Sequence, residues 1–226
     1  MKPRFSPAAF TLIEMLTVMA VIAILASILL SLNGLVQRKA ALTRAHGEIV
    51  AMSAACESYK SDFGGYPEDD TGDPSVDPDT VKLCPLRDGD PTKPIYSDAN
   101  LVLYKALSGD AKQGSNPEPP ATRSDKPDGR AETKPYYEFR PAQLRKSANG
   151  DIEGIKDPFG NLYGYSTTAG AYERFYRVRL QTTPGAKRLA SGGYNPTFDL
   201  WSTGGVISQA SNAALDPDRN RWEKNW

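Results

Sequence analysis

One carboxylate, Glu14, is the most unusual side chain in this sequence for chemistry. It is the only charged residue between Phe10 and Leu32, in the stretch FTLIEMLTVMAVIAILASILLSL. A carboxylate near the middle of a bilayer costs about 2.5–3.5 kcal/mol on insertion scales. An acid in such an apolar segment is therefore expected to have a function, and its natural partner is a cation close enough to neutralise it.

A possible source of that cation lies just upstream. The first nine residues, MKPRFSPAA, contain Lys2 and Arg4 and no acid. Cleavage between Ala9 and Phe10 would create an α-amine four residues before Glu14, within the same chain or close to a neighbouring chain. A secretory signal has a shorter apolar core, with its small-residue cleavage site after that core. The alternative is a signal anchor whose Glu14 reaches the lipid headgroups.

The remaining reactive residues do not predict a catalytic site. His46 is the single histidine, which excludes a His-rich metal site, and Cys56 and Cys84 fit no C-x-x-C spacing. No Gly-x-Ser-x-Gly motif and no phosphate-binding loop is present. With 27 basic and 27 acidic residues the net charge is zero, so no basic field favours nucleic acid. We expect neither an enzyme nor a nucleic-acid partner.

A long helix must position Glu14. The apolar run is long enough to span a bilayer, which takes about 20 residues, so residues 10–32 are predicted to be the transmembrane half of that helix. The short basic flank should stay cytoplasmic and place the rest of the chain outside.

The helical pattern continues through residues 33–63 as the soluble half of the same helix. An apolar stripe runs along it, formed by Leu35, Leu42, Ala45, Ile49, Met52, Cys56, Tyr59 and Phe63, while Arg38, Lys39, Arg44 and Glu48 are expected on other faces. The pattern ends at Gly64-Gly65-Tyr66-Pro67. A coiled coil is the alternative use of the stripe. Cys56 is expected to be a small buried hydrophobe, with a Cys56–Cys84 disulfide as the alternative, and His46 a surface residue.

Residues 64–226 are expected to form the soluble domain on which the second half of the helix packs. A helix is predicted at Ser97–Leu107, capped by Ser97 or Asp98 and stopped by Gly109. Residues 109–135 are polar and proline-rich, which predicts a long surface loop that could be mobile. A turn is predicted at 157–161, and strands are predicted at 162–166, 172–181 and 197–203. The predicted fold is α+β, with the long helix packed on a small antiparallel sheet.

The stretch Ala9-Phe10-Thr11-Leu12-Ile13-Glu14 resembles the processing site of type IV prepilins and type II secretion pseudopilins. The resemblance implies that a prepilin peptidase cuts before Phe10 and methylates its amine. It also implies that Glu14 sets the register of a subunit in a growing filament. The sequence departs from the family at Ala9, where glycine is usual, and at Ser31, where many relatives have a helix-bending proline.

Later motifs resemble the major, G-type pseudopilin of type II secretion. They are, in order, Tyr59-Lys60 with Gly65-Tyr66-Pro67, DPFGNLYGY at 157–165, FDLWSTGG at 198–205, and the final Asn225-Trp226. That resemblance implies a calcium ion in the loop after the last strand. Val206 stands at the family's acidic position, so Asp216, Asp218 and Glu223 are the candidate ligands. The alternative is a polar C-terminal segment held by packing of Trp222 or Trp226.

Taken together, the resemblance implies a structural subunit that polymerises through its N-terminal helix into a periplasmic filament. Its implied partners are further copies of itself, minor pseudopilins, the prepilin peptidase, and an inner-membrane assembly platform with its ATPase. The implied location is the inner membrane, crossed once, with the C-terminal domain in the periplasm. A type IV pilus or DNA-uptake pilin and a signal-anchored periplasmic binding module are the alternatives.

We predict that the mature protein begins at N-methylated Phe10, as the resemblance to type IV prepilins implies. Intact-mass measurement and N-terminal peptide analysis of the membrane-extracted protein test this. A mature protein that still begins at Met1 would show that the leader is not a prepilin leader.

Overall fold

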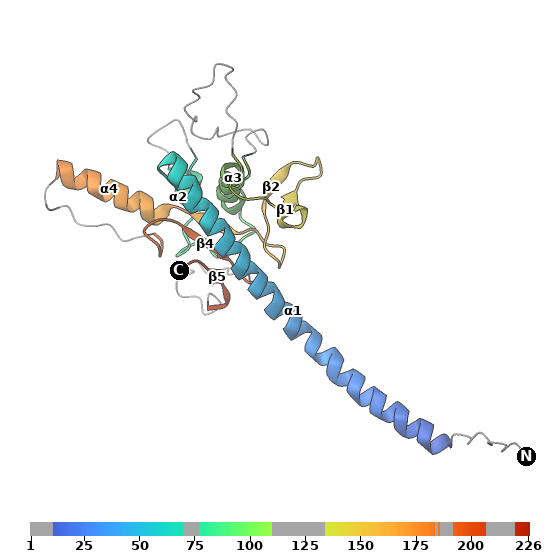
Figure 1. Cartoon of the computed structure of the whole chain (residues 1–226). Coiled ribbons are helices and arrows are strands. Elements are labelled where there is room, and N and C mark those ends of the chain that lie inside the picture. The colour runs from blue at the N-terminus through green and yellow to red at the C-terminus, as the bar shows by residue number, and fades with distance from the viewer. Residues whose placement is uncertain (1–10, 70–76, 110–133, 184, 186–191, 207–219) are drawn as a thin grey trace, which may run out of the picture. The chain divides into compact units, whose positions relative to one another are not determined.

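The computed structural model describes residues 11–69, 77–109, 134–183, 185, 192–206 and 220–226 (Figure 1). The chain divides into two compact units, residues 1–41 and 42–226, and the long helix α1, Leu12–Phe63, contributes to both. The other helices and strands all belong to the second unit. The structure is therefore α+β, as the sequence predicted.

In the first unit, α1 carries large apolar side chains that are all exposed. Between Leu12 and Leu25 their exposed fractions range from 51% to 83%. Within the described residues, no helix meets the length and hydropathy expected of a membrane-crossing segment. The predicted span starts at Phe10, outside the described residues, and the side chains of residues 28–33 are also not described. The transmembrane assignment of residues 10–32 remains a prediction.

The helix ends where the sequence predicted. Gly64 has φ 79°, and its N–H donates to the carbonyl of Lys60 at 2.7 Å. This left-handed residue after the last turn closes the helix, and glycine adopts it without a Cβ clash.

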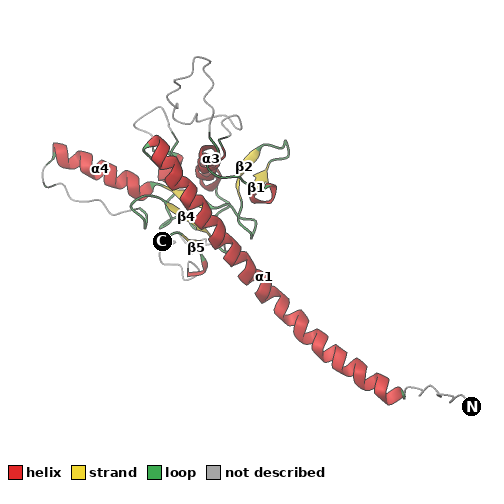
Figure 2. Ribbon diagram, viewed as in Figure 1, coloured by secondary structure: helices red, strands yellow, loops and turns green. Residues whose placement is uncertain are grey.

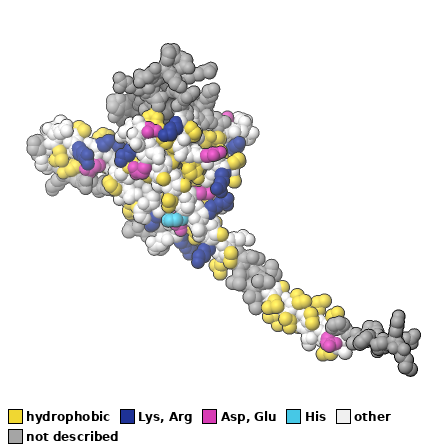
Figure 3. All heavy atoms as spheres, viewed as in Figure 1, with side chains coloured by type: hydrophobic (Ala, Val, Ile, Leu, Met, Phe, Trp, Pro, Cys, Tyr) yellow, Lys and Arg dark blue, Asp and Glu magenta, His cyan; other side chains and the backbone are white. Residues whose placement is uncertain are grey.

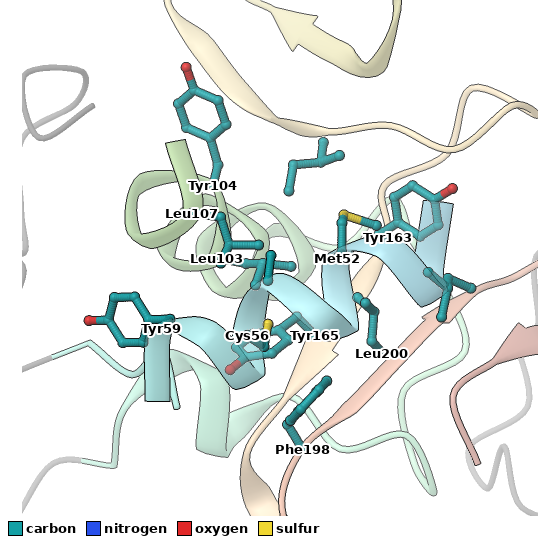
Figure 4. Close-up of a cluster of buried hydrophobic side chains, with 13 residues drawn as sticks. Met52, Cys56, Tyr59, Leu103, Tyr104, Leu107, Tyr163, Tyr165, Phe198 and Leu200 are labelled. Atoms are coloured by element: carbon teal, nitrogen blue, oxygen red, sulfur yellow. The ribbon is translucent and has the colours of Figure 1, made fainter. Parts of the chain in front are cut away.

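In the second unit, the apolar stripe of α1 forms the centre of the core (Figure 4). Ile49, Met52, Ala55, Cys56 and Tyr59 pack with side chains from a further helix and from strands and the residues beside them, which include Leu103, Leu107, Tyr163, Tyr165, Phe198 and Leu200. The stripe is buried only from Ala45 onward, because Leu35 belongs to the first unit and is exposed. Within the chain, the stripe packs against this helix and the nearby strands, so for residues 45–59 this packing replaces the coiled-coil alternative.

The predicted second helix forms as α3, Pro94–Ser108, after the short α2, Asp79–Lys82. It starts earlier than predicted, because Pro94 occupies its first turn, where proline's missing N–H is not needed. Ser97 and Asp98 therefore lie inside the helix and do not cap it, and the Ser97 hydroxyl instead donates to the carbonyl of Glu153. Gly109 ends the helix at φ 72°, as predicted.

The strands form two small antiparallel sheets (Figure 2). After the 3-10 turn η1, Pro141–Gln143, the strands β1, Leu144–Lys146, and β2, Ile152–Ile155, pair as a hairpin. The second sheet has the order β3-β4-β5, with β3 at Gly164–Ser166, β4 at Asp199–Ser202 and β5 at Glu223–Lys224. The strands β3 and β4 are completely buried and lie within two of the predicted strands.

The strand predicted at 172–181 is wrong. The segment is instead part of the helix α4, Thr168–Thr182. The alternation of Tyr176, Val178 and Leu180 suggested a strand, but Phe175 falls on the opposite face of that strand. In a helix, Tyr172, Phe175 and Tyr176 share one side, because residues three and four apart are neighbours. An ion pair between Glu173 and Arg177 also has this i,i+4 spacing.

One buried amide, Asn100 in α3, joins the helix to β2 and to Tyr163, the residue before β3. Its Nδ2 donates to the carbonyl of Ile155 at 3.1 Å and to that of Tyr163 at 2.7 Å, and its Oδ1 accepts from the N–H of Ile155. Asn100 is fully buried, so these bonds replace the water that the amide loses on folding.

We predict that Asn100→Ala lowers the free energy of unfolding by about 2–4 kcal/mol, because it removes three buried hydrogen bonds and leaves a cavity. Chemical denaturation followed by circular dichroism measures the change. The matched control is Ser97→Ala, one turn earlier on the same helix, which removes a single exposed hydrogen bond and should cost about 1 kcal/mol or less. Equal costs for the two variants would contradict the role given to Asn100.

Candidate functional site

The first candidate site is the start of α1, where Glu14 is bonded to Thr11. The Thr11 backbone N–H donates to Glu14 Oε2 at 2.9 Å, and the Thr11 hydroxyl donates to the same oxygen at 2.7 Å. The backbone N–H of Glu14 donates back to Thr11 Oγ1 at 3.3 Å. This is a capping box, in which a threonine and an acid three residues later satisfy each other's backbone donors.

The capping box gives Glu14 a structural role that was not predicted, although the sequence shows the T-x-x-E spacing of such a box. Within the described residues the carboxylate folds back on its own helix terminus, where it complements the positive end of the helix dipole. Ala9 and Phe10, the predicted cleavage residues, lie outside the described residues.

The helix surface that follows Glu14 is apolar on all sides. Large apolar side chains more than half exposed are spread around the whole helix at about 100° per residue: Met15, Leu16, Val18, Val21 and Ile24. A helix that is hydrophobic all round is normally buried in protein or lipid. The free chain therefore presents a surface that a membrane or other helices must cover.

The second candidate site is the predicted calcium site, of which only Glu223 lies in the described residues. Glu223 is in β5, and its Oε2 lies 3.5 Å from Nδ1 of His46, which is exposed as predicted. Asp216 and Asp218 lie outside the described residues. In the described part of the chain, no three His, Cys, Asp or Glu side chains gather to hold a metal ion. Calcium binding remains a prediction.

The C-terminal residues are held by packing and backbone pairing. Trp222 stacks on Trp201 of β4 with ring centroids 6.1 Å apart. The Asn225 side chain accepts from the N–H of Leu200 and donates to the carbonyl of Phe198, and its own backbone N–H donates to the carbonyl of Leu200. These contacts confirm tryptophan packing for residues 220–226.

The two internal motifs, at 157–165 and 198–205, lie against each other. The Asp157 carboxylate accepts from the N–H groups of Phe159 and Asn161 and from the Ser202 hydroxyl, the last at 2.6 Å. Burial raises the pKa of Asp157 although these hydrogen bonds oppose the rise. Gly164 pairs with Trp201, and a Cβ at Gly164 would lie 2.1 Å from the indole ring. These motif residues therefore build the fold.

Glu48 differs from its predicted position on an outer face of α1, since it is buried. Its Oε2 accepts a 2.7 Å hydrogen bond from the Tyr163 hydroxyl, and Arg44 lies 3.5 Å from its other oxygen. Burial raises the pKa of Tyr163 well above its usual range, and the bond to Glu48 adds to the rise. The sequence pattern could not show that a tyrosine from a distant strand would supply the partner.

Both cysteines are free thiols, so the Cys56–Cys84 disulfide is not formed. Cys56 is buried in the core as predicted, and burial raises its pKa far above that of an exposed thiol. Cys84 donates to the carbonyl of Gly192. Burial also raises the Cys84 pKa, which keeps the thiol protonated and poorly nucleophilic.

Residues 5–30 match the family model of the prokaryotic N-terminal methylation motif, a type IV pilin-like signal. No curated protein and no solved structure matches the chain. The matched segment includes Ala9, Phe10, Thr11 and Glu14, and it places the functional signal at the first candidate site.

We predict that Thr11→Val destabilises the first turn of α1 by about 0.5–2 kcal/mol, because valine keeps the shape of threonine and removes the capping hydroxyl. Amide hydrogen exchange of residues 12–16 in detergent micelles measures the loss. Thr11→Ser is the control, since it keeps the hydroxyl and should keep the protection. Unchanged exchange in Thr11→Val would show that the capping box does not hold this turn.

Proposed function

Because residues 5–30 carry the methylation motif, we propose that this chain is a type IV pilin-like filament subunit. More specifically, we propose a major, G-type pseudopilin of a type II secretion-like periplasmic filament. The observation that carries the proposal is the matched motif, at the start of a helix whose all-round apolar surface contains one acid, Glu14.

Maturation would follow from the order of the segments. Lys2 and Arg4 hold the leader on the cytoplasmic side while the apolar half of α1 enters the inner membrane. A prepilin peptidase then cuts between Ala9 and Phe10 and methylates the new amine. After cleavage, the positive amine of Phe10 and the carboxylate of Glu14 can pair between neighbouring copies, which fixes the axial register of two apolar helices that otherwise slide freely.

The structure of the free chain sets one condition for this pairing. Glu14 Oε2 already accepts two hydrogen bonds from Thr11, so an amine from another copy must share or replace them. In a low-dielectric helix bundle a carboxylate–ammonium pair is stronger than a bond to a neutral hydroxyl. Assembly would therefore draw Glu14 away from its own helix.

The apolar half of α1 would form the filament core, with the second unit outside. Extraction from the membrane requires work that this chain cannot supply, since it has no phosphate-binding loop. We therefore propose an inner-membrane platform and its ATPase as partners, together with minor pseudopilins. The single histidine and the structural use of Asp157 and Glu48 support a structural role and not a catalytic one.

A subunit of a long surface pilus is the second candidate. Such subunits often carry a disulfide-closed C-terminal loop, and this sequence has no cysteine after Cys84. That difference favours the pseudopilin. We retain the calcium site of major pseudopilins in the proposal, with Asp216, Asp218 and Glu223 as its candidate ligands.

We predict that Glu14→Ala is still cleaved and methylated but enters filaments at least about tenfold less than the unaltered chain, because the charge pair that sets the register is lost. Sedimentation of sheared filaments measures incorporation, and mass analysis of Phe10 measures processing. The matched control is Thr17→Ala, one turn later, whose hydroxyl bonds only the backbone carbonyl of Glu14. Normal filaments from Glu14→Ala would remove the role proposed for this carboxylate.

A further inference from the structure

The segment that contains α4 adds a surface that the neighbouring sheet does not require. The strands β3 and β4 are antiparallel neighbours, with Ser166 paired to Asp199. A hairpin loop of about two residues can join such strands. Here residues 167–198 lie between them, and they include α4. Ordering so long a segment costs chain entropy on folding, so the surface that it builds is a candidate for a function of its own.

One wall of a pocket is built by this segment. The pocket has a volume of about 250 Å³ and lies between α4 and the region of α2, within the second unit. Its α4 wall includes Thr168, Tyr172 and Phe175, and the opposite wall includes Lys82 of α2 and Arg87. None of these five residues is part of the buried hydrophobic core. We call this concave surface the α2–α4 pocket.

Hydrogen bonds hold the two walls together. The Thr168 hydroxyl donates to the carbonyl of Val81 in α2 at 2.7 Å. The Cys84 thiol donates to the carbonyl of Gly192, which follows α4 in the chain. All four residues line the pocket. The walls are therefore held in place by the fold, and a ligand would not have to order them.

Two aromatic rings of α4 are exposed at the α2–α4 pocket. Phe175 is 55% exposed and Tyr172 is 37% exposed. Figure 3 shows hydrophobic side chains beside basic ones along α4. An aromatic side chain that is open to solvent in a pocket offers a flat apolar face to a ligand. Such a face suits a ligand ring whose own faces carry C–H groups.

The polar groups at the pocket retain hydrogen-bonding capacity. Asp77 lines the pocket and is exposed, and in the part of the chain that the structure describes no hydrogen bond reaches its carboxylate or the Tyr172 hydroxyl. Lys82 donates to Asp79 at 2.8 Å, which uses one of the three donors of its ammonium group. The pocket therefore offers a free acceptor and free donors to a ligand.

Arg87 is a further donor, and its guanidinium group is already oriented. Its Nε and Nη2 bind the Asp88 carboxylate, and Nη2 also donates to the carbonyl of Lys82. Among the described residues, the remaining nitrogen, Nη1, makes no hydrogen bond. A ligand can use this nitrogen without paying to immobilise the side chain.

The charges at the pocket do not favour an ion. Lys82 is paired with Asp79, and Arg87 is paired with Asp88. The hydrogen bond to Asp79 raises the pKa of Lys82 and the charge of Asp77 adds to the rise, so Asp77 lies near this ammonium group. An anionic ligand would meet Asp77, and a cationic one would meet Lys82 and Arg87. A neutral hydroxyl group both donates and accepts, so it can bond to either kind of side chain.

We propose that the α2–α4 pocket binds one ring of a neutral sugar. The C–H face of the ring packs on Phe175 and Tyr172, and its hydroxyls donate to Asp77 and accept from Lys82 and Arg87. Pockets that enclose a drug-sized ligand have about 300–1,000 Å³, so a pocket of about 250 Å³ suits a single ring. The inference does not rest on the proposed filament function, because none of the lining residues that the structure describes comes from α1.

Ligand-observed saturation-transfer NMR tests this on the full-length chain, in micelles of a detergent without a sugar headgroup. The probes are the methyl glycosides of glucose, galactose and N-acetylglucosamine. At least one should bind with a dissociation constant on the order of 1 mM, as expected for one small ring with few contacts. Glucuronate and protonated glucosamine keep the ring and add one charge of either sign. Both should bind at least about threefold more weakly than the tightest neutral ring, because each meets a like charge.

Two substitutions test whether the binding occurs at this pocket. Phe175→Ala removes a stacking ring and Asp77→Ala removes the acceptor, and each should weaken binding about tenfold. Val178→Ala is the control for the first, since it shortens an exposed apolar side chain of α4 outside the pocket lining. Asp151→Ala is the control for the second, since it removes an exposed acid between β1 and β2. Both controls should keep the affinity of the unaltered chain, and all four variants should keep its thermal transition.

Three results would overturn the inference. The first is that no neutral ring binds at about 20 mM, well above the expected dissociation constant. The second is that Phe175→Ala and Asp77→Ala bind as the unaltered chain does, which would place the binding elsewhere. The third is that a charged ring binds more tightly than every neutral one, which would make the pocket a site for an ion. None of these results bears on the proposed filament function, which methylation of Phe10 and filament formation test separately.

Discussion

The burial of one side of α1 is the constraint on which the second unit depends. Ile49, Met52, Cys56 and Tyr59 provide a row of apolar side chains that no short strand pair could supply alone. Two small sheets of two and three strands are marginal without a cover, and β3 and β4 are buried because α1 and α3 pack on them. The Asn100 amide then ties α3 to the backbone at Ile155 and Tyr163.

The same helix serves the opposite purpose in the first unit. From Leu12 to Leu25 it exposes apolar side chains on every face, and its one acid is held by the capping box with Thr11. A surface of this kind has to be covered by lipid or by other helices. This need agrees with the proposed function, in which a processed helix passes from a membrane into a bundle of like helices.

In the second unit, the motifs at 157–165 and 198–205 form a framework of internal contacts, and most of α4 lies outside it. Asp157, Ser202, Gly164 and Trp201 are used for internal contacts between the motif at 157–165 and that at 198–205. The helix α4 leaves this framework after one buried turn and presents exposed aromatic and basic side chains. The framework accounts for the packing of the unit, while most of α4 lies outside that core.

The sequence by itself determined the long helix to Phe63 and the burial of Cys56, because both depend on local periodicity. It also determined the helix end at Gly109, which depends on a cap, and the functional signal around Phe10 and Glu14, which is a short motif. Only the tertiary structure decided that residues 172–181 are helical. Their sequence fits both the alternation of a strand and the spacing of a helix, and the burial of Thr168–Ala171 favours the helix. It likewise decided that Glu48 is buried, since the hydroxyl that satisfies it comes from Tyr163, far away in the chain. Local patterns record which backbone a segment prefers, but burial and pairing depend on which distant side chains fold against it.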